Sequence, residues 1–158
     1  MMSETAERTA EAIVLRFWAV IDETVNDPGE SLFLPEGTMT IETFQAKGTL
    51  QLAGYFAGRR EKSAVQSRMT RHVVSNLRHA MLPDGQRIVD CLVTVFSSYG
   101  PRPAPLGPPS TVADFTFTCG TDADGQLKLD TVTGRLVFVG GDTPDLTAAQ
   151  KTTGAQNG

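Results

Sequence analysis

The sequence predicts an α+β fold in which a long, curved, antiparallel or mixed sheet wraps around N-terminal helices. Three observations carry this prediction. Apolar residues over 5–26 recur at helical spacing, residues 68–81 alternate with a period of two, and two turn signals, Pro83–Gly85 and Asp122–Gly125, separate later strands. Helices followed by a run of strands are typical of α+β domains.

The first helix is predicted over residues 5–26, where one broad apolar stripe follows the helical period. The turn residues Asn26–Gly29 end it. Asp22 falls late in this helix, at the border of the stripe, where a carboxylate gains nothing from the helix dipole. We expect the stripe to pack the helix into the mouth and floor of the sheet through Phe17, Trp18, Ile21 and Val25.

Residues 31–47 are expected to form a loop that leads into one short strand. A second helix then opens at Gly48, with Thr49 as its N-cap, and runs to about Lys62. Four strands follow, over 68–81, 88–99, 111–119 and 126–139. We expect one domain over 1–141 and a flexible tail over 142–158, which is polar and rich in Gly, Thr and Ala.

The strand over 68–81 mixes polar and β-branched residues. A strict alternation places His72, Val74, Asn76 and Arg78 on one face, and Arg71, Val73, Ser75, Leu77 and His79 on the other. A histidine and an asparagine beside a valine fit either a polar-lined pocket or a half-exposed strand that meets water. Both interpretations stay open from the pattern.

Residues 100–110 hold five of the nine prolines of the chain. Such a segment is stiff, extended and unable to join a strand ladder. It fits a surface connection that blunts a sheet edge, a lid over a pocket, or an arm that reaches a partner subunit.

Composition excludes several classes of protein. The 158 residues are 40% hydrophobic and 20% charged, which is ordinary for one soluble domain. The net charge is −4 and Lys and Arg form no stripe, so nucleic acid is not the expected partner. No apolar run approaches the length of a membrane span, and the first eight residues lack the apolar segment of a signal peptide. We therefore expect a cytoplasmic protein.

Metal and cofactor sites are not expected either. Cys91 and Cys119 lie in separate apolar segments without a CxxC pair, which predicts two reduced, buried thiols. His72 and His79, the only histidines, fall on opposite faces of the predicted strand. These residues offer no ligand cluster, so we predict no metal and no cofactor.

The chain resembles the SnoaL-like branch of the nuclear-transport-factor-2-like superfamily, over about residues 5–140. The resemblance rests on Phe17–Asp22, on Gly48 before a helix that ends in Phe56–Arg60, on Thr70–Leu77, and on the closing strand Thr131–Val139. It implies the cone-shaped fold. It leaves the activity open, because the superfamily includes dehydratases, isomerases, cyclases, hydrolases and non-catalytic subunits.

A sharper resemblance links the chain to the scytalone-dehydratase-like enzymes, which place an aspartate late in the first helix and a histidine near the start of the next long strand. Asp22 and His72 occupy these positions. The resemblance implies that His72 is the base and Asp22 its orienter, supported by Thr70 and Arg71. It further suggests a substrate pocket with Asn76 and Arg135 as polar anchors, lined by Trp18, Tyr55, Phe56 and Val74.

The resemblance points to two classes of function. The first is a cofactor-independent lyase or isomerase, dehydratase-like, that removes a proton from a small hydrophobic ring compound; a polyketide-cyclase-like enzyme is a variant of it. The second is a non-catalytic ligand-binding or assembly subunit, as in the small subunits of ring-hydroxylating dioxygenases. The resemblance also implies a homodimer or a homotrimer.

Overall fold

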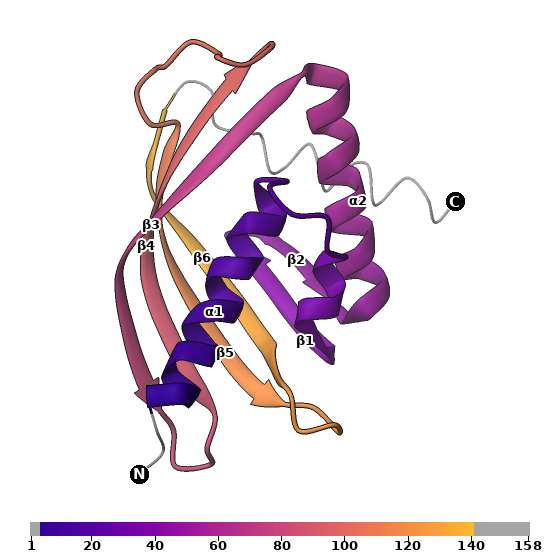
Figure 1. The fold of residues 1–158 in the computed structure, drawn as a ribbon, viewed down its shortest axis with the longest axis vertical. Helices are drawn as coiled ribbons and strands as arrows, with labels where there is room; N and C mark the ends of the chain where they lie inside the picture. The colour runs from indigo at the N-terminus through magenta and orange to yellow at the C-terminus, as the bar shows by residue number, and fades with distance from the viewer. Residues whose placement is uncertain (1–3, 141–158) are drawn as a thin grey trace.

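The computed structural model describes residues 4–140, which form two helices and a six-stranded mixed sheet. The strand order is β2-β1-β6-β5-β4-β3, and all neighbours are antiparallel except β1 and β6, which are parallel. The sheet is curved, α1 crosses its inner face, and α2 lies beside β1 and β2 (Figure 1). This is the predicted fold class. The elements are α1 Glu4–Ile21, η1 Gly29–Leu32, β1 Phe33–Ile41, β2 Phe44–Lys47, α2 Gly48–Gln66, β3 Arg68–Met81, β4 Arg87–Tyr99, β5 Thr111–Thr121 and β6 Leu127–Val139.

Helix α1 packs its apolar stripe against the sheet but ends earlier than predicted. Phe17, Trp18 and Ile21 are each at most 5% exposed. The helix stops at Ile21 because Glu23 adopts a left-handed conformation with φ 57°. The Thr24 N–H then donates to the Ala19 carbonyl, which closes the end of the helix as in a Schellman motif. Glycine normally takes this position, so no stop signal is visible in the sequence before residue 26.

The segment before α2 forms a hairpin instead of a loop and one strand. Strands β1 and β2 pair from Thr38–Lys47 to Ile41–Phe44. Helix α2 also differs from the prediction at both ends: Lys47, not Thr49, is the N-cap, and the helix continues to Gln66. The Lys47 N–H is satisfied by the Gln51 side chain, whose Oε1 lies 2.8 Å away. The Gln51 side chain therefore satisfies the N–H of the N-cap residue, and no side chain of the N-cap residue caps the first turn.

Strand β3 covers the predicted residues, but its side chains after the midpoint point to the opposite faces from those predicted. Its pairing with β4 shifts register between Ser75 and Arg78, and Asn76 there has φ 54°. This bulge adds a residue to β3. After it, Leu77 and His79 are partly buried whereas Asn76 is exposed. The prediction that His79 lies on the face opposite to His72 is therefore wrong.

The turns and the proline-rich segment agree more closely with the predictions. Leu82 and Gln86 close the first hairpin turn, and Asp122 and Gln126 close the second. Residues 100–110 contain no strand, and Leu106 is 89% exposed. The segment joins β4 to β5, two neighbouring inner strands. It therefore leaves the sheet at one end and does not run along an edge strand.

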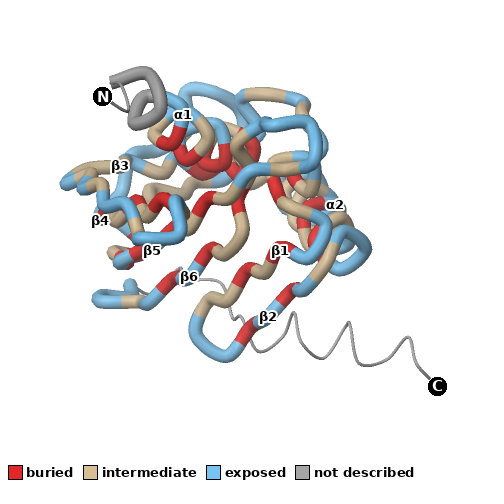
Figure 2. Tube along the Cα trace, turned by 90° about the horizontal axis from the view of Figure 1, so that it is seen from below, coloured by how far each residue is buried: buried red, intermediate tan, exposed pale blue. Residues whose placement is uncertain are grey.

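The core lies between the helices and the inner face of the sheet, where the buried residues gather (Figure 2). Cys91 and Cys119 are buried and free, as predicted, and burial raises the pKa of each thiol to about 11. None of the described helices is long and apolar enough to cross a membrane. The predicted tail over 142–158 lies outside the described residues.

Candidate functional site

Asp22 and His72 meet where the end of α1 reaches the start of β3. The Nδ1 atom of His72 lies 2.5 Å from Oδ1 of Asp22. The backbone N–H of His72 donates to the other carboxylate oxygen at 2.7 Å. Asp22 is the residue directly after α1, not a residue within it, so its carboxylate extends past the helix end to β3. One carboxylate thus fixes both the backbone and the ring of residue 72.

One further side chain donates to this carboxylate, and an arginine contacts that side chain in turn. The Thr70 hydroxyl donates to Oδ1 of Asp22 at 2.9 Å. Arg59, on α2, donates through Nη2 to Oγ1 of Thr70 and through Nε to the Ile21 carbonyl, both at 3.3 Å. The side chains of His72 and Asp22 are only 9% and 8% exposed. A negative charge beside a helix C-terminus is unfavourable, and the hydrogen bonds from His72 and Thr70 offset that cost.

Electrostatics set the charge state of the pair. Burial opposes the charge of Asp22, but the hydrogen bonds from His72 and Thr70 outweigh it, so the pKa of this carboxyl lies below 3.8. Burial lowers the pKa of the His72 imidazole below 6.5; the charges of Arg59 and Arg68 act in the same direction, and Asp22 opposes them. At neutral pH the pair is a carboxylate and a neutral imidazole, with Nδ1–H facing Asp22 and Nε2 unprotonated.

The indole of Trp18 holds the plane of the imidazole. The two rings stack with centroids 4.7 Å apart and an interplanar angle of 19°. Trp18 is itself held edge-on by Phe115, with centroids 4.7 Å apart. Because Asp22 fixes one edge of the imidazole and Trp18 one face, the ring has little freedom to turn.

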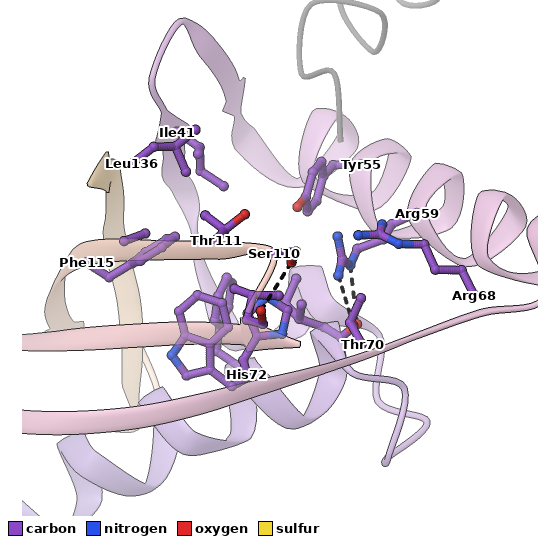
Figure 3. Close-up of a pocket in the computed structure, with 15 residues that line it drawn as sticks. Ile41, Tyr55, Arg59, Arg68, Thr70, His72, Ser110, Thr111, Phe115 and Leu136 are labelled. Carbon is purple, nitrogen blue, oxygen red and sulfur yellow. Dashed lines mark hydrogen bonds between the residues drawn. The ribbon is translucent and has the colours of Figure 1, made fainter. Parts of the chain in front are cut away.

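His72 faces a cavity of about 100 Å³ between α1, α2 and the sheet (Figure 3). Most of its wall is apolar and comes from α1 and from the inner faces of β1, β4, β5 and β6. The polar side chains are fewer. They are Tyr55, Arg59, Arg68, Thr70, His72, Ser110 and Thr111.

The structure brings together only some of the predicted site residues. Trp18 and Tyr55 line the cavity with His72. Phe56 and Val74 do not line it: Phe56 is buried against Phe17, and Val74 lies two residues further along β3.

Asn76 and Arg135 lie away from the cavity, which corrects their predicted position. The bulge in β3 exposes Asn76, which borders a separate polar hollow with Asp90 and Asp114. Arg135 is exposed and pairs with Asp114 in the β5–β6 ladder. Strict alternation could not predict the position of Asn76, because that position depends on the register shift between β3 and β4. Arg135 was expected at the site from the resemblance alone, and the alternation of β6, in which Val132 and Gly134 are buried, places it on the outer face.

Two further residues of the site, Arg59 and Arg68, are absent from the prediction, although signals for both exist in the sequence. Tyr55 and Arg59 are four residues apart in a helix and so share a face. Arg68, Thr70 and His72 share a face of β3 before the bulge. Within residues 4–140 no cluster of three or more His, Cys, Asp or Glu side chains could hold a metal ion.

Comparison with known proteins rests on structure alone, because no family model and no curated protein matches the sequence. ActVI-ORFA from Streptomyces coelicolor superimposes with a TM-score of 0.73 at 13% identity, over 87% of this chain and 99% of that chain. A "putative scytalone dehydratase" from Novosphingobium aromaticivorans gives 0.68 at 17% identity, over 89% of each chain. The β subunit of a "putative aromatic-ring-hydroxylating dioxygenase" from the same organism gives 0.70 at 10% identity, over 89% of this chain and 94% of that chain.

These likenesses establish the fold, and at such identities they establish no activity. A further matching structure is described as an NTF2-like protein with a cystatin-like fold, at 16% identity and a TM-score of 0.65. Each of the four matches extends over at least 87% of this chain. The chain therefore has the nuclear-transport-factor-2-like fold that its resemblance to the SnoaL-like proteins predicted.

Proposed function

We propose that the protein is a cofactor-independent acid–base enzyme of the lyase or isomerase type, with His72 as the base and Asp22 as its orienter. One observation carries the proposal: the Nδ1 edge of His72 is held at 2.5 Å by a buried carboxylate while the ring faces an apolar cavity. That arrangement leaves Nε2 as the nitrogen that can reach a ligand, with its lone pair available.

The chemistry balances without a cofactor. Nε2 takes a proton from a carbon next to a carbonyl, and the electrons of the C–H bond move into the enolate. Asp22 stabilises the imidazolium that forms. In a dehydratase the enolate expels a β-hydroxyl, which leaves as water with the proton from His72; in an isomerase the proton returns to another carbon. In a cyclase the same enolate would add to a second carbonyl of the substrate, whose C=O π bond opens, and the oxygen would take the proton from His72 to become a hydroxyl.

The cavity limits what can react there. An engineered cavity of roughly 150 Å³ holds benzene, whereas this cavity measures about 100 Å³. The enclosed part of a substrate is therefore a compact apolar group, such as part of a small ring, with its carbonyl toward the polar side chains. Apolar walls with few polar groups are typical of small-molecule sites.

The alternative is a non-catalytic ligand-binding or assembly subunit. The likeness to the β subunit of a ring-hydroxylating dioxygenase favours it, because that structure shares the fold at a TM-score of 0.70. In this case the Asp22–His72 pair would be structural, since it also ties the end of α1 to β3.

A pair of probe substrates separates these functions. Isomerisation of cyclohex-3-enone and dehydration of 3-hydroxycyclohexanone both yield cyclohex-2-enone, whose ultraviolet absorption reports the rate. We expect the wild-type protein to catalyse at least one of the two reactions. General acid–base catalysis contributes about 10²–10⁴-fold, so His72→Gln should lose about that factor and Asp22→Asn somewhat less.

His79→Gln is the matched control. It removes the other histidine, which lies beyond the bulge on β3 and pairs with Glu11 at 3.5 Å. This variant should keep the wild-type rate. Turnover that survives in His72→Gln would contradict the assignment of the base. No turnover of either probe by a folded wild-type protein would favour the non-catalytic subunit.

We also propose that the chain forms a homodimer or a homotrimer. The support is a set of exposed apolar side chains at the end of β6: Val137, Phe138 and Val139 are 45%, 68% and 63% exposed. Large exposed apolar patches commonly mark interaction surfaces. Light scattering coupled to gel filtration measures the mass in solution, and the mass of a monomer would overturn this assignment.

A further inference from the structure

Two guanidinium groups share one end of the cavity beside His72. They belong to Arg59 on α2 and to Arg68, the first residue of β3. Figure 3 shows both beside Tyr55 and Thr70, across the cavity from Phe115. Among the described residues that line the cavity, none is an Asp or a Glu. The described part of the cavity wall therefore carries two positive side chains and no acidic one.

Arg59 is oriented by neutral acceptors and not by a carboxylate. Its Nε donates to the Ile21 carbonyl and its Nη2 to the Thr70 hydroxyl, both at 3.3 Å. A guanidinium carries five N–H donors, so these two contacts position the group and leave donors for a ligand. Such a planar fork matches the two oxygens of a carboxylate.

The positive charges of Arg59 and Arg68 act on the imidazole of His72. Arg59 and Arg68 both lower the pKa of His72, so both lie within electrostatic reach of the imidazole. Fixed positive charge in an apolar site attracts anions more strongly than it would in water. A ligand that fills the apolar part of the cavity would bring a negatively charged group, if it has one, to these two residues.

We propose that Arg59, with the charge of Arg68 beside it, forms an anion subsite that binds a carboxylate of the substrate, so that the site takes small apolar ring acids. The inference names the substrate class of the Asp22–His72 site, and it rests on the proposed function only for the chemical step after binding. Recognition of the carboxylate itself requires no turnover.

Binding can be measured through Trp18, the single tryptophan of the chain, because it lines the cavity and stacks on His72. Its fluorescence is titrated at pH 7 with cyclohexanecarboxylate and with cyclohexanecarboxamide, which have nearly the same shape. We expect the carboxylate to bind with a Kd at least about tenfold lower than that of the amide. Neither probe absorbs where the indole is excited.

Variants on α2 test whether the charge of Arg59 causes the preference for the carboxylate probe. Arg59→Gln should remove most of the preference for the carboxylate and leave the affinity for the amide within about twofold. Arg59→Lys should retain part of the preference, since it keeps the charge but loses the fork. Arg60→Gln is the matched control, because it removes the neighbouring positive charge on the same helix. The Nη2 atom of Arg60 donates at 2.8 Å to the Asp27 carbonyl, outside the cavity. The Arg60→Gln variant should bind both probes as the wild type does.

Three results would overturn the anion subsite: equal affinity for the two probes, tighter binding of the amide, or no saturable response up to about 10 mM carboxylate. An equal loss in Arg60→Gln and Arg59→Gln would do so as well. Circular dichroism confirms that each variant is folded. A carboxylate preference without turnover of the two ketones or of their ring-carboxylic-acid analogues leaves this inference standing and contradicts the proposed enzyme. Turnover without the preference supports the enzyme and contradicts this inference.

Discussion

The carboxylate of Asp22 contacts residue 72 at two points, the imidazole Nδ1 and the backbone N–H. The backbone bond fixes where β3 starts relative to α1, and the side-chain bond fixes the tautomer of the imidazole. Burial then keeps that imidazole neutral, since its pKa lies below 6.5. The arrangement supplies an unprotonated base over the whole neutral range.

This charge state predicts the pH dependence of the proposed reaction. A base must be unprotonated, so kcat/KM should fall as the pH drops through the lowered pKa of His72, with a midpoint below 6.5. The Asp22 carboxylate opposes this lowering, so Asp22→Asn should move the midpoint further down while it reduces the rate. The pH–rate profile of cyclohex-2-enone formation measures both effects. A midpoint above 6.5 in the wild type would contradict the assignment.

Trp18 connects the site to the core and should contribute strongly to stability. It is 5% exposed and stacks on His72 and against Phe115. Truncation of a buried tryptophan costs about 3–5 kcal/mol, so Trp18→Ala should lower the free energy of unfolding by that amount. Trp18→Phe should cost less, because it keeps an aromatic ring. Urea denaturation measures both, and a change below about 1 kcal/mol for Trp18→Ala would show that α1 does not pack on the sheet through this residue.

At the scale of the elements, the site depends on where α1 ends. Glu23 takes the left-handed conformation that terminates the helix, and this places Asp22 directly after its last residue, facing β3. If α1 continued to residue 26, as the stripe suggests, Asp22 would lie inside the helix and its backbone would point elsewhere. The end of the helix is therefore part of the site.

A glycine in place of Glu23 should stabilise the protein. A non-glycine residue in the left-handed region is strained, and a negative charge here also opposes the helix dipole. We expect Glu23→Gly to raise the free energy of unfolding by about 0.5–1 kcal/mol. Glu23→Ala removes the charge but keeps the strain, so it should gain less. Denaturant titration of the three proteins decides this, and a destabilised Glu23→Gly would mean that the carboxylate of Glu23 has a partner in solution.

At the scale of the molecule, the cavity forms because a curved sheet closes over α1 while α2 covers the remaining side. The connection over residues 100–110 ends at Ser110, which lines this cavity together with Thr111. The middle of the segment makes few contacts with the rest of the fold: Ser98 donates to the Pro105 carbonyl at 2.8 Å, and Leu106 is exposed.

Replacement of residues 102–108 by a tight turn should therefore leave the stability nearly unchanged. Loop-closure free energy depends weakly on length, about 0.6 kcal/mol for each doubling, and few buried contacts would be lost. The same deletion could act on ligand access or on oligomerisation, which Trp18 fluorescence and light scattering would detect. A deletion that prevents folding would show that the segment belongs to the core.

The sequence by itself determined the elements and the fold class. Helical spacing, strand alternation and the turn residues depend on local physics, so they predicted both helices, both hairpin turns and the four long strands, the strands nearly at their observed bounds. They did not predict the end of α1 at Ile21 or the hairpin of β1 and β2. The pairing of Asp22 with His72 was also accessible, but only through resemblance to known enzymes, since no local rule joins residues this far apart in the chain.

Tertiary structure decided which side chains share the cavity. Asn76 and His79 exchanged faces because a bulge shifts β3 against β4, and a bulge is a property of two strands together. Arg59 and Arg68 belong to different elements, and only the packing of α2 beside the start of β3 brings both to one end of the cavity. Local periodicity assigns a face to a residue, whereas the composition of a site depends on register and packing between elements.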